Sequence, residues 1–123
     1  MSKTPEGKVK DEVRKIFQNI NDKWPGRLWY CMPMGQMYGK RGVPDFLVCV
    51  NGKFVAIETK AEGGKPTAMQ KLELRKIAEA GGYNLIVFPA ALELLSRMLH
   101  ELAEFGDMGV AESINQYGHE AIR

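Results

Sequence analysis

Apolar residues near the start of the chain recur at the spacing of a helix. They lie three or four positions apart and so share one helical face: Val9, Val13, Ile16, Phe17 and Ile20. Thr4 is a suitable N-cap, and Pro5 fits the first helical position because the N–H that it lacks has no helical partner there. The pattern predicts a helix from about Pro5 to Ile20, which ends before the polar Asn21-Asp22 pair.

Short β-type runs between glycine- and proline-containing breaks predict three strands in the middle of the chain. Arg27–Met32 is rich in aromatic residues, and a loop punctuated by glycines follows it. Phe46–Val50 and Lys53–Thr59 are joined by Asn51-Gly52, a dipeptide that accommodates the positive φ angles of a two-residue turn. The sequence therefore predicts one strand followed by a β-hairpin.

The second half of the chain returns to helical periodicity around a fourth strand. Thr67–Ala80 is amphipathic and is stopped by Gly81-Gly82, and Tyr83–Phe88 is a buried-strand pattern. A last helix is predicted from about Ala90 to Phe105, where four leucines form one stripe: Leu92, Leu95, Leu99 and Leu102. Residues 107–123 have weak periodicity, and we expect them to be disordered or to form a short helix that docks on a partner.

This order of elements predicts an α/β fold. The hairpin is antiparallel, whereas the strand-helix-strand passage from Lys53 to Phe88 favours a right-handed parallel crossover, so the sheet is expected to be mixed. Helices should cover both faces. At 123 residues the chain has room for a single core, and we expect one domain over residues 1–106.

Composition places the chain among globular proteins. Hydrophobic residues make up 45% and charged residues 26%, and no apolar run approaches the roughly 20 residues of a spanning helix. The polar start of the sequence lacks the apolar stretch of a signal peptide, which predicts a cytoplasmic protein without a membrane partner. If a phage encodes it, the compartment is the bacterial host's cytoplasm.

The cysteines and histidines do not form a recognisable metal or disulfide pattern. Cys31 and Cys49 are too few and too far apart for a zinc site or a disulfide scaffold, so we expect two buried thiols. His100 and His119 have no His or Cys partners at short spacing. A histidine-based or zinc-based nuclease mechanism is therefore not expected.

Positive charge is concentrated in the first third of the chain. Residues 1–41 carry nine Lys/Arg against four Asp/Glu, a net charge of +5, whereas residues 42–123 have a net charge of −3. The cations that could face phosphates are Lys8, Lys10, Arg14, Lys15, Lys40 and Arg41. On charge alone, a solvated helix face with a basic loop explains them equally well.

Three charged residues are expected to meet at one end of the hairpin. Asp45 enters its first strand, and Glu58 and Lys60 lie on one face at the end of its second strand. Two carboxylates held close together repel each other unless a cation lies between them, and their hard oxygen atoms suit Mg2+ or Mn2+. With a lysine beside them, these groups fit metal-assisted hydrolysis of a phosphodiester.

These residues belong to a larger pattern that resembles a known family. The segments Gly42-Val43-Pro44-Asp45 and Glu58-Thr59-Lys60, with Gln70, resemble the VRR-NUC family of the PD-(D/E)XK nuclease superfamily, in its stand-alone phage or bacterial form. The resemblance covers about Glu6 to Phe88. It implies a restriction-endonuclease-like αβββαβ core, extended here by a C-terminal helix.

The resemblance also implies roles for individual residues. Asp45, Glu58 and the backbone carbonyl of Thr59 would be metal ligands, and Lys60 the catalytic lysine. Glu6 matches a first-helix glutamate that contributes to the metal site in similar nucleases, although an acidic residue in a first helical turn also complements the helix dipole. Gln70 would lie next to the active site and be part of its catalytic set, and Thr67-x-x-Gln70 is equally typical of a capping box. The implied cofactor is Mg2+, which Mn2+ can replace.

The function implied by the resemblance is a metal-dependent DNA endonuclease. Stand-alone members of the family are associated with homodimers that cut four-way (Holliday) DNA junctions. A nuclease acting on flaps, nicks, single strands or RNA, and a non-catalytic DNA-binding module of the same fold, remain open alternatives.

Residues of the loop before Asp45, with Lys8 of the first helix, are the best candidates for DNA contact: Tyr38, Lys40, Arg41, Gly42 and Lys8. Gly42 allows the backbone to approach a substrate closely, or serves only the turn. The aromatic and methionine residues of the segment Trp29–Tyr38 are more typical of a core or a dimer interface than of base stacking. A homodimer would use this segment, or the last helix with the residues that follow it.

Overall fold

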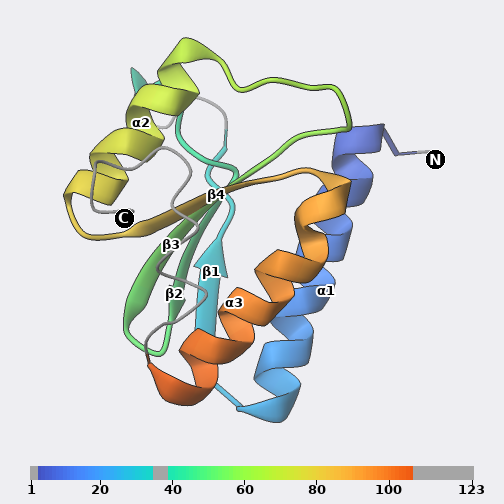
Figure 1. Ribbon diagram of the computed structural model, residues 1–123, viewed down its shortest axis with the longest axis vertical. Helices are drawn as coiled ribbons and strands as arrows, with labels where there is room; N and C mark the ends of the chain where they lie inside the picture. Colours follow the sequence, from blue (N-terminus) through green and yellow to red (C-terminus); the bar gives the residue numbers. More distant parts are fainter. Residues whose placement is uncertain (1–2, 35–38, 107–123) are drawn as a thin grey trace.

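The computed structural model describes residues 3–34 and 39–106, which form a four-stranded sheet between helices (Figure 1). In chain order the elements are α1 (Pro5–Lys23), β1 (Leu28–Cys31), β2 (Phe46–Val50), β3 (Lys53–Thr59), α2 (Ala68–Glu79), β4 (Tyr83–Val87), the short 3₁₀ helix η2 (Pro89–Ala91) and α3 (Leu92–Phe105). The predicted order αβββαβ with a C-terminal helix is confirmed, and the fold is consistent with a restriction-endonuclease-like core. Residues 107–123 and their predicted role lie outside the described residues.

The strands are ordered β1-β2-β3-β4 across the sheet. β1 and β2 are antiparallel, as are β2 and β3, whereas β3 and β4 are parallel. The mixed sheet predicted from the hairpin and the crossover is therefore confirmed. At the hairpin turn Asn51 has φ 49° and Gly52 φ 82°, both in the left-handed region that a two-residue turn of this kind requires.

Helix α1 begins where the capping residues predict but ends three residues later. The Thr4 hydroxyl accepts a hydrogen bond from the Gly7 N–H at 3.0 Å. At the other end, Asn21 continues the helix and uses its side chain to bond both the N–H and the carbonyl of Leu28. The predicted end at Ile20 is wrong. The polar residues after Ile20 continue the helix, and the Asn21 side chain bonds it to β1.

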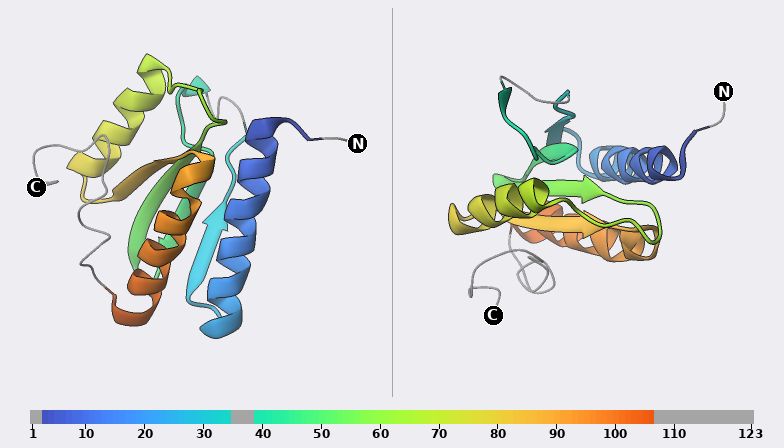
Figure 2. Two further views of the ribbon diagram at one scale, coloured as in Figure 1. Left: turned by 45° about the vertical axis from the view of Figure 1, so that its right-hand side comes forward. Right: turned by 90° about the horizontal axis from the view of Figure 1, so that it is seen from above.

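Helices α1 and α3 lie side by side over one face of the sheet (Figure 1; Figure 2, left). The main core lies between them and the strands, and its largest fully buried side chains include Phe17, Phe46, Leu85, Met98 and Leu99. Helix α2 covers the opposite face, where Leu74 packs with Ala56 and Ile86. Helices therefore cover both faces, as predicted, but with unequal cores.

Helix α2 leaves part of its side of the sheet uncovered. Trp29, Cys49 and Phe54 are direct neighbours across β1, β2 and β3. Their side chains point to the α2 side of the sheet, but α2 lies over β3 and β4. As a result Trp29 is 64% exposed and Phe54 41% exposed.

The prediction of two buried thiols is wrong for the same reason. Cys49 is exposed and Cys31 is partly exposed. Both lie on the alternate strand positions that face the uncovered region, and strand alternation by itself does not say how far a helix extends across a sheet.

The described helices offer no candidate for a membrane span, since none is both long and apolar enough.

Candidate active site

The hairpin brings Asp45 beside the end of β3. Phe46 pairs with Ile57, so Asp45, one position earlier, lies next to the residues that follow Ile57. One carboxylate oxygen of Asp45, Oδ2, accepts hydrogen bonds from the Thr59 N–H at 2.9 Å and from the Thr59 hydroxyl at 2.6 Å. The other oxygen, Oδ1, lies 3.7 Å from the ammonium of Lys10. Asp45 is therefore held by one oxygen and presents the other to the site.

Glu58 is held in the same way but is far more buried. It is 1% exposed, and its Oε2 accepts a hydrogen bond from the Gln70 side-chain amide at 2.9 Å. The Lys60 ammonium lies 3.7 Å from the same oxygen. Oε1 is the one buried side-chain oxygen or nitrogen among the described residues that has no hydrogen-bond partner. A buried oxygen without a partner is costly, and a cation would satisfy it.

Burial and neighbouring negative charge raise the pKa of Glu58 to about 8 from an ordinary value of 4.5. Burial has the largest effect and the charge of Asp45 the next, while Lys60 lowers the pKa in part and Glu6 raises it. With no added cation, this carboxyl holds its proton at neutral pH. A cation bound at the site would favour the ionised form.

Gln70 makes the contacts of both of its predicted roles. Its side-chain oxygen accepts a hydrogen bond from the Thr67 N–H at 2.8 Å, while the Thr67 hydroxyl accepts from the Gln70 N–H at 3.1 Å. This is a complete capping box, which starts α2. Because the oxygen is used by the cap, the amide nitrogen is turned toward Glu58. A role for Gln70 in cleavage stays a prediction.

Glu6 lies in the first turn of α1 and has a partner that the sequence prediction did not consider. The Lys10 ammonium is 3.7 Å from a Glu6 carboxylate oxygen and also 3.7 Å from Asp45. Lys10 was expected on a phosphate-facing surface, but it points into the acidic site. The available signal was its position four residues after Glu6, which places both side chains on one helical face.

The donor chemistry fits a hard divalent cation. In the described parts of the chain, no three His, Cys, Asp or Glu side chains are grouped closely enough to form a complete metal cluster. Asp45 and Glu58 nevertheless each have one oxygen fixed by the protein and one directed elsewhere. These two carboxylates would hold the cation, with a backbone carbonyl, water or substrate oxygen completing its coordination. The Thr59 carbonyl and Glu6 stay predicted ligands.

Gly42 is required by the packing of the chain. Its φ is 78°, and a Cβ at this position would lie 2.5 Å from the backbone oxygen of Met69 in α2. The close approach therefore fixes the loop before Asp45 against the start of α2. A contact between Gly42 and DNA stays a prediction.

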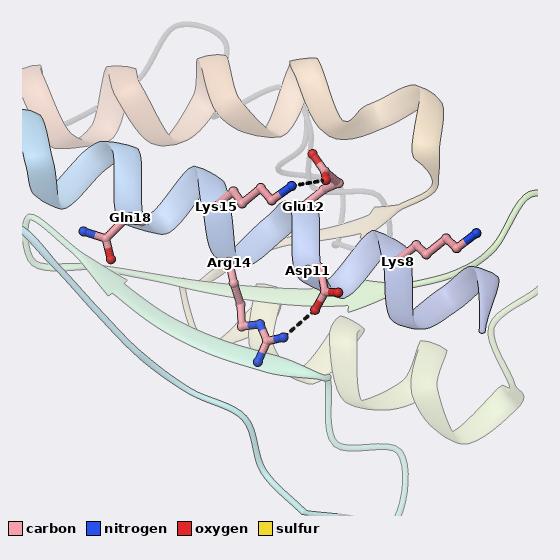
Figure 3. A pocket seen from close by; sticks show the side chains of 6 residues that line it. All are labelled: Lys8, Asp11, Glu12, Arg14, Lys15 and Gln18. Carbon is pink, nitrogen blue, oxygen red and sulfur yellow. Dashed lines mark hydrogen bonds and ion pairs between the residues drawn. The ribbon is translucent and has the colours of Figure 1, made fainter. Parts of the chain in front are cut away.

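The basic residues of α1 are largely neutralised by acidic neighbours on the same helix. A shallow hollow along α1 shows Lys15 paired with Glu12 at 2.9 Å and Arg14 paired with Asp11, with Lys8 exposed nearby (Figure 3). This favours a solvated helix face for most of these charges.

The predicted DNA-contacting residues of the loop before Asp45 differ in whether they have an acidic partner. Lys40 pairs with Glu73 at 3.3 Å, and Arg41 is exposed. Tyr38 lies outside the described residues. No observation tests the footprint predicted from the sequence, so all five of its residues stay predictions: Lys8, Tyr38, Lys40, Arg41 and Gly42.

Among curated proteins, the chain is similar to "Putative nuclease p44" of Acyrthosiphon pisum secondary endosymbiont phage 1. The two are 48% identical over 50 residues, a segment that covers 40% of this chain and 53% of that protein. The similarity thus spans about half the length of the phage protein. No family model matches the sequence, and no solved structure is significantly similar to the chain.

Proposed function

We propose that this protein is a metal-dependent endonuclease that hydrolyses DNA phosphodiester bonds. The observation that carries the proposal is the pair of acidic side chains at one end of the hairpin, Asp45 and Glu58, beside the ammonium of Lys60. In each of them hydrogen bonds fix one oxygen and leave the other without a hydrogen bond. The partial similarity to a phage protein named as a nuclease supports the same class.

The residues divide the work of hydrolysis between them. Asp45 and Glu58 would hold Mg2+ or Mn2+, with Thr59 supplying a carbonyl. When bound, such a cation polarises a phosphoryl oxygen and lowers the pKa of a water molecule. Lys60, with its side chain 12% exposed, is held in place by Glu58 and would orient the attacking water or stabilise charge on the phosphate. Gln70 would keep the Glu58 carboxylate in the required orientation.

A four-way DNA junction is the proposed substrate. It rests on the resemblance of Gly42–Asp45, Glu58–Lys60 and Gln70 to stand-alone VRR-NUC nucleases. Resolution of such a junction needs two symmetric cuts, and one chain of this size holds one such site, so we also propose a homodimer. The cell compartment would be the cytoplasm of a bacterial host.

The uncovered part of the sheet is the best surface for the second copy of the chain. The exposed row Trp29, Cys49 and Phe54 belongs partly to the segment predicted to form a dimer interface. It continues into a mostly apolar groove, bordered by the Lys40–Glu73 ion pair and lined by Val43, Pro44, Leu47, Phe54 and Ile77. The other predicted surface is helix α3 with the residues that follow it. Leu95, Leu99 and Leu102 of α3 are buried in the core, and residues 107–123 lie outside the described residues. A monomeric mass in light scattering at the assay concentration would contradict the dimer.

The experiment that tests the function compares matched DNA substrates. Four-way, nicked, flap, linear duplex and single-stranded DNA are incubated with the protein in Mg2+, in Mn2+ and in EDTA. Symmetric paired cuts in the four-way DNA, lost in EDTA and in Asp45→Asn, are the expected result. Arg14→Gln is the control, because Arg14 is ion-paired on the outer side of α1.

Other outcomes distinguish the alternatives. Faster cutting of a flap, a nick, a single strand or an RNA substrate would retain the nuclease and replace the junction. Binding of DNA without cleavage in either metal would instead identify a non-catalytic DNA-binding module.

A further inference from the structure

Among the described residues, Lys10 is the one cation that contacts two of the predicted acidic ligands. Its ammonium lies 3.7 Å from Glu6 and 3.7 Å from Asp45. The two carboxylates come from different elements, the first turn of α1 and the residue before β2. Lys10 therefore connects helix α1 to the start of the hairpin through two carboxylates.

The Lys10 ammonium lies beside the Asp45 oxygen that accepts no hydrogen bond from Thr59. Asp45 Oδ2 is occupied by two hydrogen bonds from Thr59, and Lys10 faces the other oxygen, Oδ1. Lys60 faces Glu58 Oε2, and Glu58 Oε1 has no hydrogen-bond partner. Lys10 thus faces two of the acidic side chains, Glu6 and Asp45, and Lys60 faces the third, Glu58.

The Lys10 side chain is partly exposed to solvent and only loosely held. Its side chain is 31% exposed, and both of its contacts are longer than a charged hydrogen bond, which is typically about 2.7–2.9 Å. Lys60, by contrast, is 12% exposed and contacts the buried Glu58. Of the two ammonium groups, the Lys10 group is the one that can move to solvent.

We propose that Lys10 is a resident counter-ion of the acidic site, which compensates Glu6 and Asp45 until a divalent cation takes its place. The inference rests on the proposed metal-dependent function and adds a positioning residue to it. The Lys10 ammonium must leave Asp45 Oδ1 before that oxygen can bind a cation. Lys10 therefore lowers the apparent affinity for metal and keeps the metal-free site assembled.

The test measures metal binding and thermal stability, not cleavage. Lys10→Met removes the charge and retains an aliphatic side chain of similar length. Its dissociation constant for Mn2+, measured by calorimetry, should be about three- to tenfold lower than that of the unmodified chain, because two partly exposed ion pairs no longer compete. Without metal its Tm should fall, and the increase in Tm on adding Mn2+ should be larger.

Two matched variants separate charge from shape and position. Lys10→Arg keeps the cation and should bind Mn2+ within about twofold of the unmodified chain. Lys15→Met removes a lysine of the same helix that pairs with Glu12 away from the site, and it should change neither quantity.

The outcomes distinguish this inference from the proposed function. Equal Mn2+ affinity in Lys10→Met and the unmodified chain, with binding abolished by Asp45→Asn, would overturn the counter-ion and leave the metal site standing. Weaker binding in Lys10→Met would overturn it as well. If the unmodified chain bound no Mn2+, both the counter-ion and the metal-dependent function would be overturned.

Discussion

The two faces of the sheet do different physical work. Against α1 and α3 the strands present a largely apolar surface, to which β2 alone contributes Phe46, Val48 and Val50. Against α2 the apolar contacts are limited to a small cluster around Leu74, and the same face carries the buried Glu58. Because neighbouring residues of β3 point to opposite faces, Ile57 stabilises the fold while Glu58 belongs to the site.

This difference between the two faces explains how a small chain tolerates a buried acidic side chain. A buried carboxyl group with an oxygen that has no partner is destabilising, and the apolar face with its two helices offsets that cost. Truncations on the α1 and α3 face should therefore act on stability alone, whereas changes on the α2 face should act on chemistry and on how stability depends on pH.

The largest stability effect is expected from truncation on the apolar face. Leu99 is fully buried in the main core, and Leu99→Ala should lower the free energy of unfolding by about 2–5 kcal/mol through lost burial and a cavity. Urea denaturation measures it. The fraction that remains folded should cleave DNA at the unmodified rate, and a change in that rate would show that the two faces are not separable.

A smaller effect, dependent on pH, is expected from Glu58. Its pKa is about 8 in the folded chain and about 4.5 when unfolded, so the folded state binds more protons between these values. In EDTA, stability should fall by a few kcal/mol as pH rises from about 5 to about 8. Glu58→Gln should remove most of this decrease, and urea denaturation at both pH values measures it. An equally steep decrease in Glu58→Gln would contradict the role given to burial.

The smallest effect is expected from Gln70→Glu. A glutamate can still accept the Thr67 N–H in the capping box, but it loses the donor to Glu58 Oε2 and adds a negative charge. We expect cleavage to fall about tenfold with Tm nearly unchanged. Thr67→Ala is the control, because it removes the Thr67 hydroxyl that accepts the Gln70 N–H in the capping box. Its main effect should be a lower Tm, with a smaller effect on the cleavage rate than that of Gln70→Glu.

The parts of the fold that the sequence predicts are those determined locally. The Asn51-Gly52 turn fixes the register of the hairpin, and that register places Asp45 beside Thr59. Capping residues likewise predict the start of α1 and of α2.

Features that depend on how far elements extend in space were predicted wrongly or missed. The exposure of Cys49 follows from the limited reach of α2 across the sheet, which no local pattern encodes. Lys10 was grouped with the basic surface because its partner Asp45 is distant in sequence. The close approach of Gly42 to Met69 was missed because these two residues are also distant in sequence.

The most direct test of the central claim is the single-turnover cleavage rate of Lys60→Ala with saturating Mg2+, on the DNA form that the unmodified chain cuts fastest. Lys60 is held 3.7 Å from Glu58 at the proposed reaction centre. The account predicts a rate about 10²–10³-fold lower, with DNA binding within about twofold. An unchanged rate would place the cleavage chemistry away from Asp45, Glu58 and Lys60 and would contradict the account.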